Sequence, residues 1–429
     1  MIYEIFTRNH GPRGTFAEVE ADLARIRALG VDVIWFMPIH PIGKNARKGS
    51  LGSPYSIRDY REVNPEFGAK ADFRRLIETA HTLGLKVMMD VVYNHTAHDS
   101  RLVGEHPDWF HQDAHDRPVT TVPEWSDVID FKHPNPALAD ELIQTLCDWA
   151  IFGVDGFRCD VASLIPPAFW ALARQRVEAV KPGVLWLAES VHAAFIAERR
   201  DAGLTAYSDS ELYPAFDLTY DYDIWPIWQA AVTGAAPVAR YLEMLRYQDC
   251  IYPANYAKLR AVENHDNPRI QALAPTPAQA AAWTAFMAFN KGPFLIYAGM
   301  ESGAAHTPSL FEPDPIPWDA YPLQAWITRL ASLKKDPALK DGVFTLLAAN
   351  PAIQAAWQSP RKSLYGIFNV SGVPGTLAVQ LPDGDYPDLL SGALLEVRGG
   401  QAALPPSAAI LRITDPIDLK PFRSRLLNF

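Results

Sequence analysis

Cysteine is scarce in this chain, and its three cysteines form no recognisable framework. Cys147, Cys159 and Cys250 stand far apart, without C-x-x-C spacing, and their odd number argues against a set of disulfides. Long apolar runs are also missing, because no stretch reaches the roughly 20 residues that a membrane-spanning helix needs. The sequence therefore predicts neither a disulfide-rich scaffold nor a membrane span.

Positive charge is not in excess either. The 39 Lys and Arg residues stand against 49 Asp and Glu, which gives a formal net charge of −10 and a pI near 5.6. This balance argues against a surface for nucleic acid or for an anionic membrane. The first residues, MIYEIFTRNH, show no basic head followed by an apolar core. No signal peptide is therefore expected, and the protein is predicted to be cytoplasmic. The sequence carries no indication of its oligomeric state.

Short β-type runs alternate with amphipathic helical patterns over residues 1–340. The runs Ile2–Phe6, Val31–Met37 and Leu85–Val92 are each followed by a helical pattern, the first of them Phe16–Leu29. The other five strands are expected near Val154–Phe157, Val184–Ala188, Ala215–Leu218, Lys258–Val262 and Pro293–Tyr297. Eight β-then-α units favour an α/β fold closed into a parallel (β/α)8 barrel, the TIM barrel. An open doubly wound sheet is the alternative, but the G-x-G-x-x-G turn of its dinucleotide-binding form is absent.

Two intervals depart from this alternation. The polar, His- and Pro-rich stretch 96–134 follows the third strand and is too long for a simple connection, so we expect a small inserted subdomain there. Beyond residue 340, short β-like segments such as Ser363–Asn369 and Ala408–Ile413 are separated by Gly, Pro and Asp turns. The predicted organisation is a barrel domain at 1–340 and a C-terminal antiparallel β-sandwich at 341–429.

Four motifs place carboxylates and histidines just after predicted strands. They are DVVYNH ending at His95, GFRCDVA around Asp160, LWLAES around Glu189 and VENHD ending at Asp266. Because the carboxyl ends of all strands meet at one face of a parallel barrel, these side chains are expected to form one site. A helix N-cap explains a single Asp at a strand end equally well. It is a poor explanation of three carboxylates with Arg158 beside them.

Three carboxylates crowded at one face must differ in protonation. Like charges separate their pKa values, so one carboxyl group stays ionised while another stays protonated near neutral pH. Glycoside cleavage needs this division between an anionic nucleophile and a protonated acid. Arg158 lies two residues before Asp160, on the same side of a strand, and would keep that carboxylate ionised. An ordinary structural ion pair is compatible with the same geometry.

The histidines His95 and His265 each follow an asparagine at the end of a predicted strand. A neutral imidazole offers one donor and one acceptor, which suits sugar hydroxyls. Taken alone, either histidine could equally be a satisfied core or loop residue. Neither has the H-x-x-x-H or similar spacing of metal ligands, so no metal ligand is predicted among the site residues.

Taken in order, the four motifs resemble the signature regions of the α-amylase superfamily of glycoside hydrolases and transglycosidases. SPYSIRDYREVNPEFG resembles the second βα loop of that family, EWSDVIDFKHPNP the end of its small inserted domain, and PFLIYAGMESG its eighth strand. The likeness covers nearly the whole chain. It implies a TIM-barrel enzyme that cleaves O-glycosyl bonds with retention of configuration.

The resemblance also implies a role for each site residue. Asp160 would be the nucleophile, Glu189 the general acid/base, and Asp266 would hold sugar hydroxyls and stabilise the transition state. The subsite of the sugar being cleaved would be lined by four further side chains: Tyr55, His95, Arg158 and His265. The tyrosine would stack beneath the sugar ring, and a rim or core tyrosine is the alternative for it.

The segment after Asp160 departs from the calcium-dependent α-amylases that the chain resembles. Those enzymes usually carry Lys and His shortly after the nucleophile, whereas Val-Ala-Ser-Leu follows here. No cofactor is expected to be required. Calcium stays open as an alternative, with Asn94 and Asp127 either as oxygen ligands or in ordinary loop hydrogen bonds.

We therefore predict a retaining glycosidase of the α-amylase type, acting on α-glucan or maltooligosaccharide through a glycosyl-Asp160 intermediate. Val161 resembles family members that accept α-1,6 bonds, or both α-1,4 and α-1,6 bonds. A transglycosidase or glucosyl isomerase is the alternative, because the motifs do not report whether water or a sugar hydroxyl reaches the intermediate. A non-catalytic carbohydrate-binding relative is disfavoured, since all three carboxylates are present. Three further side chains are candidates for outer subsites or for loop packing: Trp109, Trp125 and His192.

Overall fold

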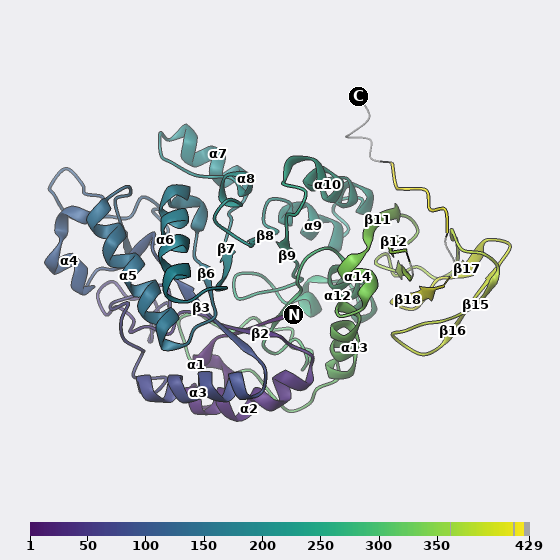
Figure 1. The fold of residues 1–429 in the computed structure, drawn as a ribbon, viewed down its shortest axis with the longest axis horizontal. Coiled ribbons are helices and arrows are strands. Elements are labelled where there is room, and N and C mark those ends of the chain that lie inside the picture. Colours follow the sequence, from purple (N-terminus) through teal and green to yellow (C-terminus); the bar gives the residue numbers. More distant parts are fainter. Residues whose placement is uncertain (361, 415–416, 424–429) are drawn as a thin grey trace. The chain divides into compact units, whose positions relative to one another are not determined.

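The computed structural model describes residues 1–360, 362–414 and 417–423 (Figure 1). It divides into two compact units. The N-terminal unit comprises residues 2–223 and 308–317, and the C-terminal unit comprises residue 1 with 224–307 and 318–429. The predicted domain boundary at residue 340 stays a prediction. Among the described residues, no helix combines the length and the apolar character that a membrane crossing requires.

The N-terminal unit is built on a parallel sheet in which each strand pairs with the next one along the chain (Figure 1). The strands are β1 (Ile2–Ile5), β2 (Val33–Phe36), β3 (Lys86–Val91), β6 (Gly156–Cys159), β7 (Leu185–Ala188) and β8 (Leu218–Tyr220). They are apolar and buried along nearly their whole length, as expected of parallel strands covered on both faces. Their carboxyl ends therefore meet at one edge.

Helices follow the strands of this unit and cover the sheet. They are α1 (Thr7–His10), α2 (Phe16–Ala28), α3 (Lys70–Thr82), α5 (Pro136–Phe152), α6 (Pro167–Val180), α7 (Ala193–Asp201) and α8 (Asp209–Leu212), with the 3-10 turn η2 (Ala162–Leu164). Their starts follow from local sequence. Thr15 and Glu18 form a capping box at α2, and the Asn135 side chain accepts from two N–H groups at the start of α5. The sequence did not predict α7, in which only Ile196 is buried.

The inserted segment leaves the sheet after β3 and returns before α5. Its two ends pair as short antiparallel strands, β4 (His95–Ala97) with β5 (Val128–Asp130). Between them lie the short helix α4 (Arg101–Glu105) and the 3-10 turn η1 (Pro107–Trp109). The β4–β5 pairing holds the return of the insert beside His95, at the carboxyl end of β3.

The C-terminal unit contains the last two short strands of the βα alternation, linked to each other by a parallel bridge between Arg260 and Phe294. Its elements up to residue 341 are α9 (Trp225–Val232), α10 (Val238–Ile251), β9 (Lys258–Leu259), α11 (Ile270–Leu273), α12 (Pro277–Phe289), β10 (Leu295–Tyr297), α13 (Gln324–Lys334) and α14 (Pro337–Asp341). The order of the eight parallel strands along both units is the one that the sequence predicts. The strand expected at Ala215–Leu218 lies at Leu218–Tyr220.

Two antiparallel sheets complete this unit. One has the order β11 (Val343–Ala348), β12 (Ile353–Gln358), β13 (Ser363–Phe368), β18 (Ala408–Ile413), and the other β14 (Thr376–Ala378), β17 (Gln401–Ala403), β16 (Leu394–Arg398), β15 (Gly384–Pro387). Buried apolar side chains of both sheets form one cluster, among them Ile367 and Leu411 of the first and Leu377 and Val397 of the second. This is the core of a β-sandwich.

Candidate active site

Arg158, in β6, lies at the centre of a group of carboxylates. Its Nη1 donates to both carboxylate oxygens of Asp90, at 2.9 and 3.0 Å, and to Oδ1 of Asp160 at 2.9 Å. Its Nη2 lies 2.8 Å from Oε1 of Glu189, and its Nε donates to the Tyr220 hydroxyl at 3.2 Å. Burial alone would lower the pKa of Arg158, but the carboxylates of Asp90 and Glu189 raise it well above its usual value. A buried, permanently charged guanidinium thus holds three carboxylates together.

Asp160 and Glu189 follow the neighbouring strands β6 and β7. The register pairs Cys159 with Ala188, the last residues of these strands, so the two carboxylates start side by side. The backbone N–H of Val161 donates to Oε2 of Glu189 at 2.7 Å. Val161 has φ of 35°, a left-handed conformation that is strained for a β-branched residue. Strain therefore lies directly after Asp160, at the residue whose N–H reaches Glu189.

Tyr55 joins the same group through Asp90. Its hydroxyl donates to Oδ2 of Asp90 at 3.1 Å, and the guanidinium of Arg158 lies 5.6 Å from the centre of its ring. Asp90 itself is fully buried within β3. The structure thus brings Tyr55, predicted as a sugar-binding residue, to the cluster that contains Arg158.

His95 lies on another side of Asp160. Its Nε2 is 3.8 Å from Oδ2 of Asp160, and its ring centre is 5.3 Å from that of Trp125. Burial lowers the pKa of His95 although the nearby Asp130 carboxylate opposes the shift. The imidazole is therefore neutral near pH 7 and offers one donor and one acceptor, as sugar binding requires.

His265 and Asp266 lie in the C-terminal unit, shortly after β9. Nε2 of His265 is 3.2 Å from Oδ2 of Asp266, whose side chain is 39% exposed. The side-chain oxygen of Asn264 accepts from the Asp266 N–H at 3.0 Å. The structure brings these two predicted residues to each other. Their place in the cluster around Arg158 stays a prediction.

Sequence reasoning misses Asp90 and Tyr220. Asp90 opens the DVVYNH motif, and its signal is a carboxylate inside an otherwise apolar strand. It faces Arg158 because the two residues are partners in the β3–β6 register. Tyr220 carries no comparable signal, because a tyrosine at the end of a strand can equally well be a buried core residue as a residue of a functional site.

The three candidates for outer subsites have different surroundings. Trp109 is 7% exposed and stacks on His106 with ring centres 3.8 Å apart, which favours loop packing. His192 stacks on Tyr222, with ring centres 4.9 Å apart. Trp125 is half-buried and packs against an apolar cluster that includes Val161. Of the three, Trp125 lies nearest to the carboxylates by its contacts.

The two residues considered as alternative calcium ligands, Asn94 and Asp127, contact other groups. The ammonium of Lys48 lies 2.9 Å from Oδ1 of Asp127, and the amide nitrogen of Asn94 faces Nδ1 of His95 at 3.3 Å. Among the described residues, no group of three or more His, Cys, Asp or Glu side chains is arranged to hold a metal ion. Calcium takes about six to eight oxygen ligands, so the surroundings of Asp127 do not fit a calcium site.

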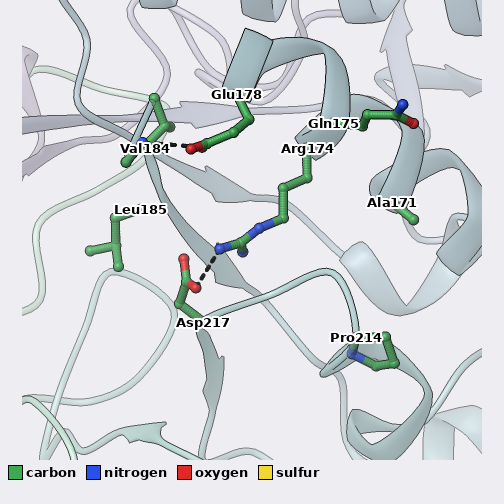
Figure 2. Close-up of a pocket in the computed structure, with 9 residues that line it drawn as sticks. Ala171, Arg174, Gln175, Glu178, Val184, Leu185, Pro214 and Asp217 are labelled. Carbon is green, nitrogen blue, oxygen red and sulfur yellow. Dashed lines mark hydrogen bonds and ion pairs between the residues drawn. The ribbon is translucent and has the colours of Figure 1, made fainter. Parts of the chain in front are cut away.

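A hollow also lies at the opposite end of β7, next to its first residue Leu185 (Figure 2). Arg174 and Asp217 form an ion pair there, with Nη2 and Oδ1 2.7 Å apart. The Glu178 carboxylate accepts from the Gly183 N–H at 3.1 Å. Asp217 is thus paired with Arg174 and Glu178 with the Gly183 backbone, so each of these carboxylates already has a partner.

Comparison with protein families points to one family for both parts of the chain. Residues 6–121 match the family model described as the α-amylase catalytic domain, and residues 345–411 match the bacterial α-amylase C-terminal domain. Among characterised sequences, the chain is 34% identical to a maltose-1-phosphate maltosyltransferase of Myxococcus xanthus over 44% of its length. It is 28% identical to α-amylase MalA of Haloarcula japonica over 93%. The chain spans only 32% and 59% of these two relatives.

Solved structures match over nearly the whole chain. An α-amylase from Lactobacillus plantarum is 42% identical, with a TM-score of 0.93 over 96% of this chain and 98% of that one. A maltogenic α-amylase from Thermotoga neapolitana is 31% identical, with a TM-score of 0.86 over 97% and 98%. The predicted fold class, a (β/α)8 barrel with an insert after the third strand and a C-terminal antiparallel β-sandwich, is confirmed. The chain belongs to the α-amylase family of glycoside hydrolases.

Proposed function

We propose that this chain hydrolyses α-glucans and maltooligosaccharides, at α-1,4 and also α-1,6 bonds, with retention of configuration. Asp160 is the nucleophile and Glu189 the general acid/base. The observation that carries this proposal is one guanidinium in contact with both carboxylates, Arg158 Nη1 with Asp160 at 2.9 Å and Nη2 with Glu189 at 2.8 Å. A retaining glycosidase needs its two carboxyl groups about 5–5.5 Å apart, and carboxylates that share one guanidinium are compatible with that spacing.

In the first step Asp160 attacks the anomeric carbon while Glu189 protonates the glycosidic oxygen. The bond between the anomeric carbon and the glycosidic oxygen then breaks. Arg158 holds Oδ1 of Asp160 and so keeps this side chain charged and oriented. We assign the attack to Oδ2, which faces His95 at 3.8 Å. His95 would then bind a hydroxyl of the sugar beside the carbon that is attacked.

In the second step water attacks the glycosyl ester of Asp160, and Glu189 takes up the proton of that water. Both oxygens of Glu189 contact donors, Oε1 the Arg158 guanidinium and Oε2 the Val161 N–H. This is the arrangement of a carboxylate that has already given up its proton. It therefore suits the state in which Glu189 acts as base.

Three further residues complete the proposal. Tyr55 would stack beneath the sugar ring, since the Asp90 carboxylate holds its hydroxyl and so orients the ring. Asp266 and His265 would bind sugar hydroxyls, and Asp266 would stabilise the transition state. For these two, the support is the VENHD motif together with their contact with each other at 3.2 Å.

Transfer to a sugar hydroxyl is the second candidate function. An apolar cluster that includes Val161 and Val191, the residues near Asp160 and Glu189, has the half-buried Trp125 packed against it. An apolar wall of this kind suits the C–H face of an acceptor sugar at least as well as it suits water. Maltosyltransferases among the relatives support the same alternative.

Incubation with maltotriose through maltoheptaose, isomaltose and pullulan, followed by chromatography of early products, tests the proposal. We expect shorter oligosaccharides whose first-formed anomer is α. Products longer than the substrate would favour transfer over hydrolysis. A β-anomer, or no turnover of any α-glucoside, would contradict the assignment of Asp160 and Glu189.

A further inference from the structure

The return of the inserted segment is held by a lysine. Nζ of Lys48 donates to the backbone oxygen of Glu124 at 2.8 Å and lies 2.9 Å from Oδ1 of Asp127. We call these three residues the Lys48 clamp. The side chain of Asp127 is only 7% exposed and that of Lys48 is 35% exposed, so the pair is sheltered rather than fully solvated. An ammonium is a compact point charge with three donors, and it can satisfy several oxygens at once.

The Lys48 clamp joins two segments that are far apart in sequence. Lys48 belongs to the connection between β2 and α3, which also carries Tyr55, and the Ser56 hydroxyl of that connection donates to the backbone oxygen of Asp127 at 2.8 Å. On the other side, Trp125 lies between Glu124 and Asp127, and its ring packs 5.3 Å from His95. The clamp therefore ties the segment that carries Tyr55 to the turn that carries Trp125.

The charges at this place are already matched. Asp127 supplies one negative charge and Lys48 one positive charge, at a distance typical of a charge-assisted hydrogen bond. A divalent ion at Asp127 would have to displace the ammonium and find further oxygen ligands. The described residues offer no cluster of three acidic, His or Cys side chains that could supply them.

We infer that the ammonium of Lys48 takes the place of a structural metal cation in this enzyme. It holds the turn 124–127 against the segment that carries Tyr55, and the surroundings of Tyr55 and His95 keep their arrangement without calcium. Lys48 is a positioning residue, because its contacts reach Tyr55 and His95 only through Ser56 and Trp125. The kinetic arm of the test below rests on the proposed function, whereas the clamp itself does not.

The test compares the full chain with Lys48→Met, Lys48→Arg and Lys44→Met. Lys44 is the matched control, since it is an exposed lysine of the same connection whose backbone N–H donates to Asp99. We measure the rate of tryptic cleavage after Arg101, whose side chain is 49% exposed in the insert, and the melting temperature, each with excess EDTA and with added calcium chloride. Neither readout requires turnover.

For the unchanged chain, we expect the cleavage rate and the melting temperature to be the same with EDTA and with calcium. Lys48→Met should accelerate cleavage after Arg101 about tenfold, since a charged hydrogen bond to a sheltered carboxylate is lost. Lys48→Arg should restore most of the protection, and Lys44→Met should behave as the parent. If EDTA loosens the parent and calcium restores it, or if Lys48→Met equals Lys44→Met, the inference is wrong.

Kinetics on maltooligosaccharides separate a positioning role from a general loss of stability. Lys48→Met should raise KM several-fold more than it lowers kcat, because it displaces the segments that carry Tyr55 and Trp125 and leaves the carboxylates on Arg158. Equal changes in Lys44→Met would contradict this. Should Lys48→Met not fold, Asp127→Asn and Lys48→Gln carry the same measurements, since each removes one charge of the clamp and keeps its size. If the parent turns over no α-glucan, the proposed function is wrong. The proteolysis result then tests the role of the Lys48 clamp by itself.

Discussion

The two ends of the parallel strands in the N-terminal unit carry opposite arrangements of charge. At the carboxyl ends, the single cation Arg158 contacts three carboxylates, those of Asp90, Asp160 and Glu189. At the amino ends, the carboxylate of Asp155 contacts three basic side chains. These are His81 at 2.7 Å, Lys181 at 3.1 Å and Lys86 at 3.4 Å.

The two clusters also differ in burial. Arg158 is fully buried and its carboxylates are at most 8% exposed. The basic partners of Asp155 are exposed by 37% for His81, 27% for Lys181 and 66% for Lys86. A buried surplus of negative charge costs stability and is kept where it performs chemistry, whereas half-exposed pairs only hold the fold. The carboxyl ends thus have the buried negative charge that the proposed reaction requires, whereas the amino ends have partly exposed ion pairs that suit a stabilising role.

Asp160→Asn should have the largest effect on activity. The variant keeps the size of the side chain and loses the nucleophile, so kcat/KM should fall by on the order of 10⁴-fold or more. Its melting temperature should stay within a few degrees of the parent, because one of three crowded negative charges is removed. Steady-state kinetics and thermal unfolding of the same preparation check both statements. The matched change at the amino ends, Asp155→Asn, should leave kcat/KM nearly unchanged.

Glu189→Gln should cost about 10²- to 10⁴-fold in kcat/KM on maltooligosaccharides, since the general acid/base is lost. The loss should be much smaller on an α-glucoside whose leaving group is an activated phenol, because such a group departs without protonation. Kinetics with both substrate classes check this. An equal loss on both would show that Glu189 does not act as the acid.

His95→Asn should lower kcat/KM by roughly 10- to 100-fold, the scale of a lost hydrogen bond in a polar site. Because burial lowers the pKa of His95, this side chain is already neutral near pH 7. The pH profile of kcat/KM should therefore keep its shape in the variant. His81→Asn, at the amino ends, is the control and should leave kcat/KM unchanged. A shifted acid limb in His95→Asn would mean that this histidine titrates in the working range.

Asp155→Asn should have the smallest effect and should act on stability alone. Burial would raise the pKa of Asp155, but the Val87 N–H and the His81 and Lys181 side chains outweigh it and lower that pKa below its usual value. Such a group stabilises the fold above the unfolded pKa near about 3.9, and that contribution disappears as pH falls through the lower folded pKa.

At pH 7 the variant should unfold more easily than the parent by roughly 1–2 kcal/mol, a modest value because the basic partners are partly exposed. The difference should vanish once the pH falls below the lowered folded pKa of Asp155. Urea unfolding at several pH values measures it. A difference that persists in acid would show that packing, and not charge, is what Asp155 contributes.

Much of the fold followed from patterns that the sequence carries locally. The apolar runs at Val33–Phe36 and Lys86–Val91, and the helix at Phe16–Ala28, were placed within a few residues because backbone propensity acts over short distances. The helix α7 was missed because only Ile196 of it is buried, and a helix held by so little apolar contact leaves no clear period in the sequence.

Most residues of the carboxylate cluster could be named from the sequence, but the contacts between them could not. Asp160, Glu189 and Arg158 could be named because each ends or precedes the end of a strand, and parallel strands present those ends together. Asp90 was overlooked because its role depends on the β3–β6 register, which sets it opposite Arg158. The left-handed Val161, whose N–H reaches Glu189, could not be foreseen either, because nothing in a valine signals that conformation.

The sequence by itself determined the order of the parallel strands, the family resemblance and the candidates for the reacting carboxylates, since these depend on residue type and spacing along the chain. Only the tertiary structure decided which charges meet. It gave Arg158 three carboxylates and Asp155 three basic partners, and it set Lys48 where calcium was considered. The physical reason is the distance along the chain over which each interaction acts. Backbone propensity acts between sequence neighbours, whereas the salt bridge between Lys48 Nζ and Asp127 Oδ1 forms only after folding has brought these atoms to 2.9 Å.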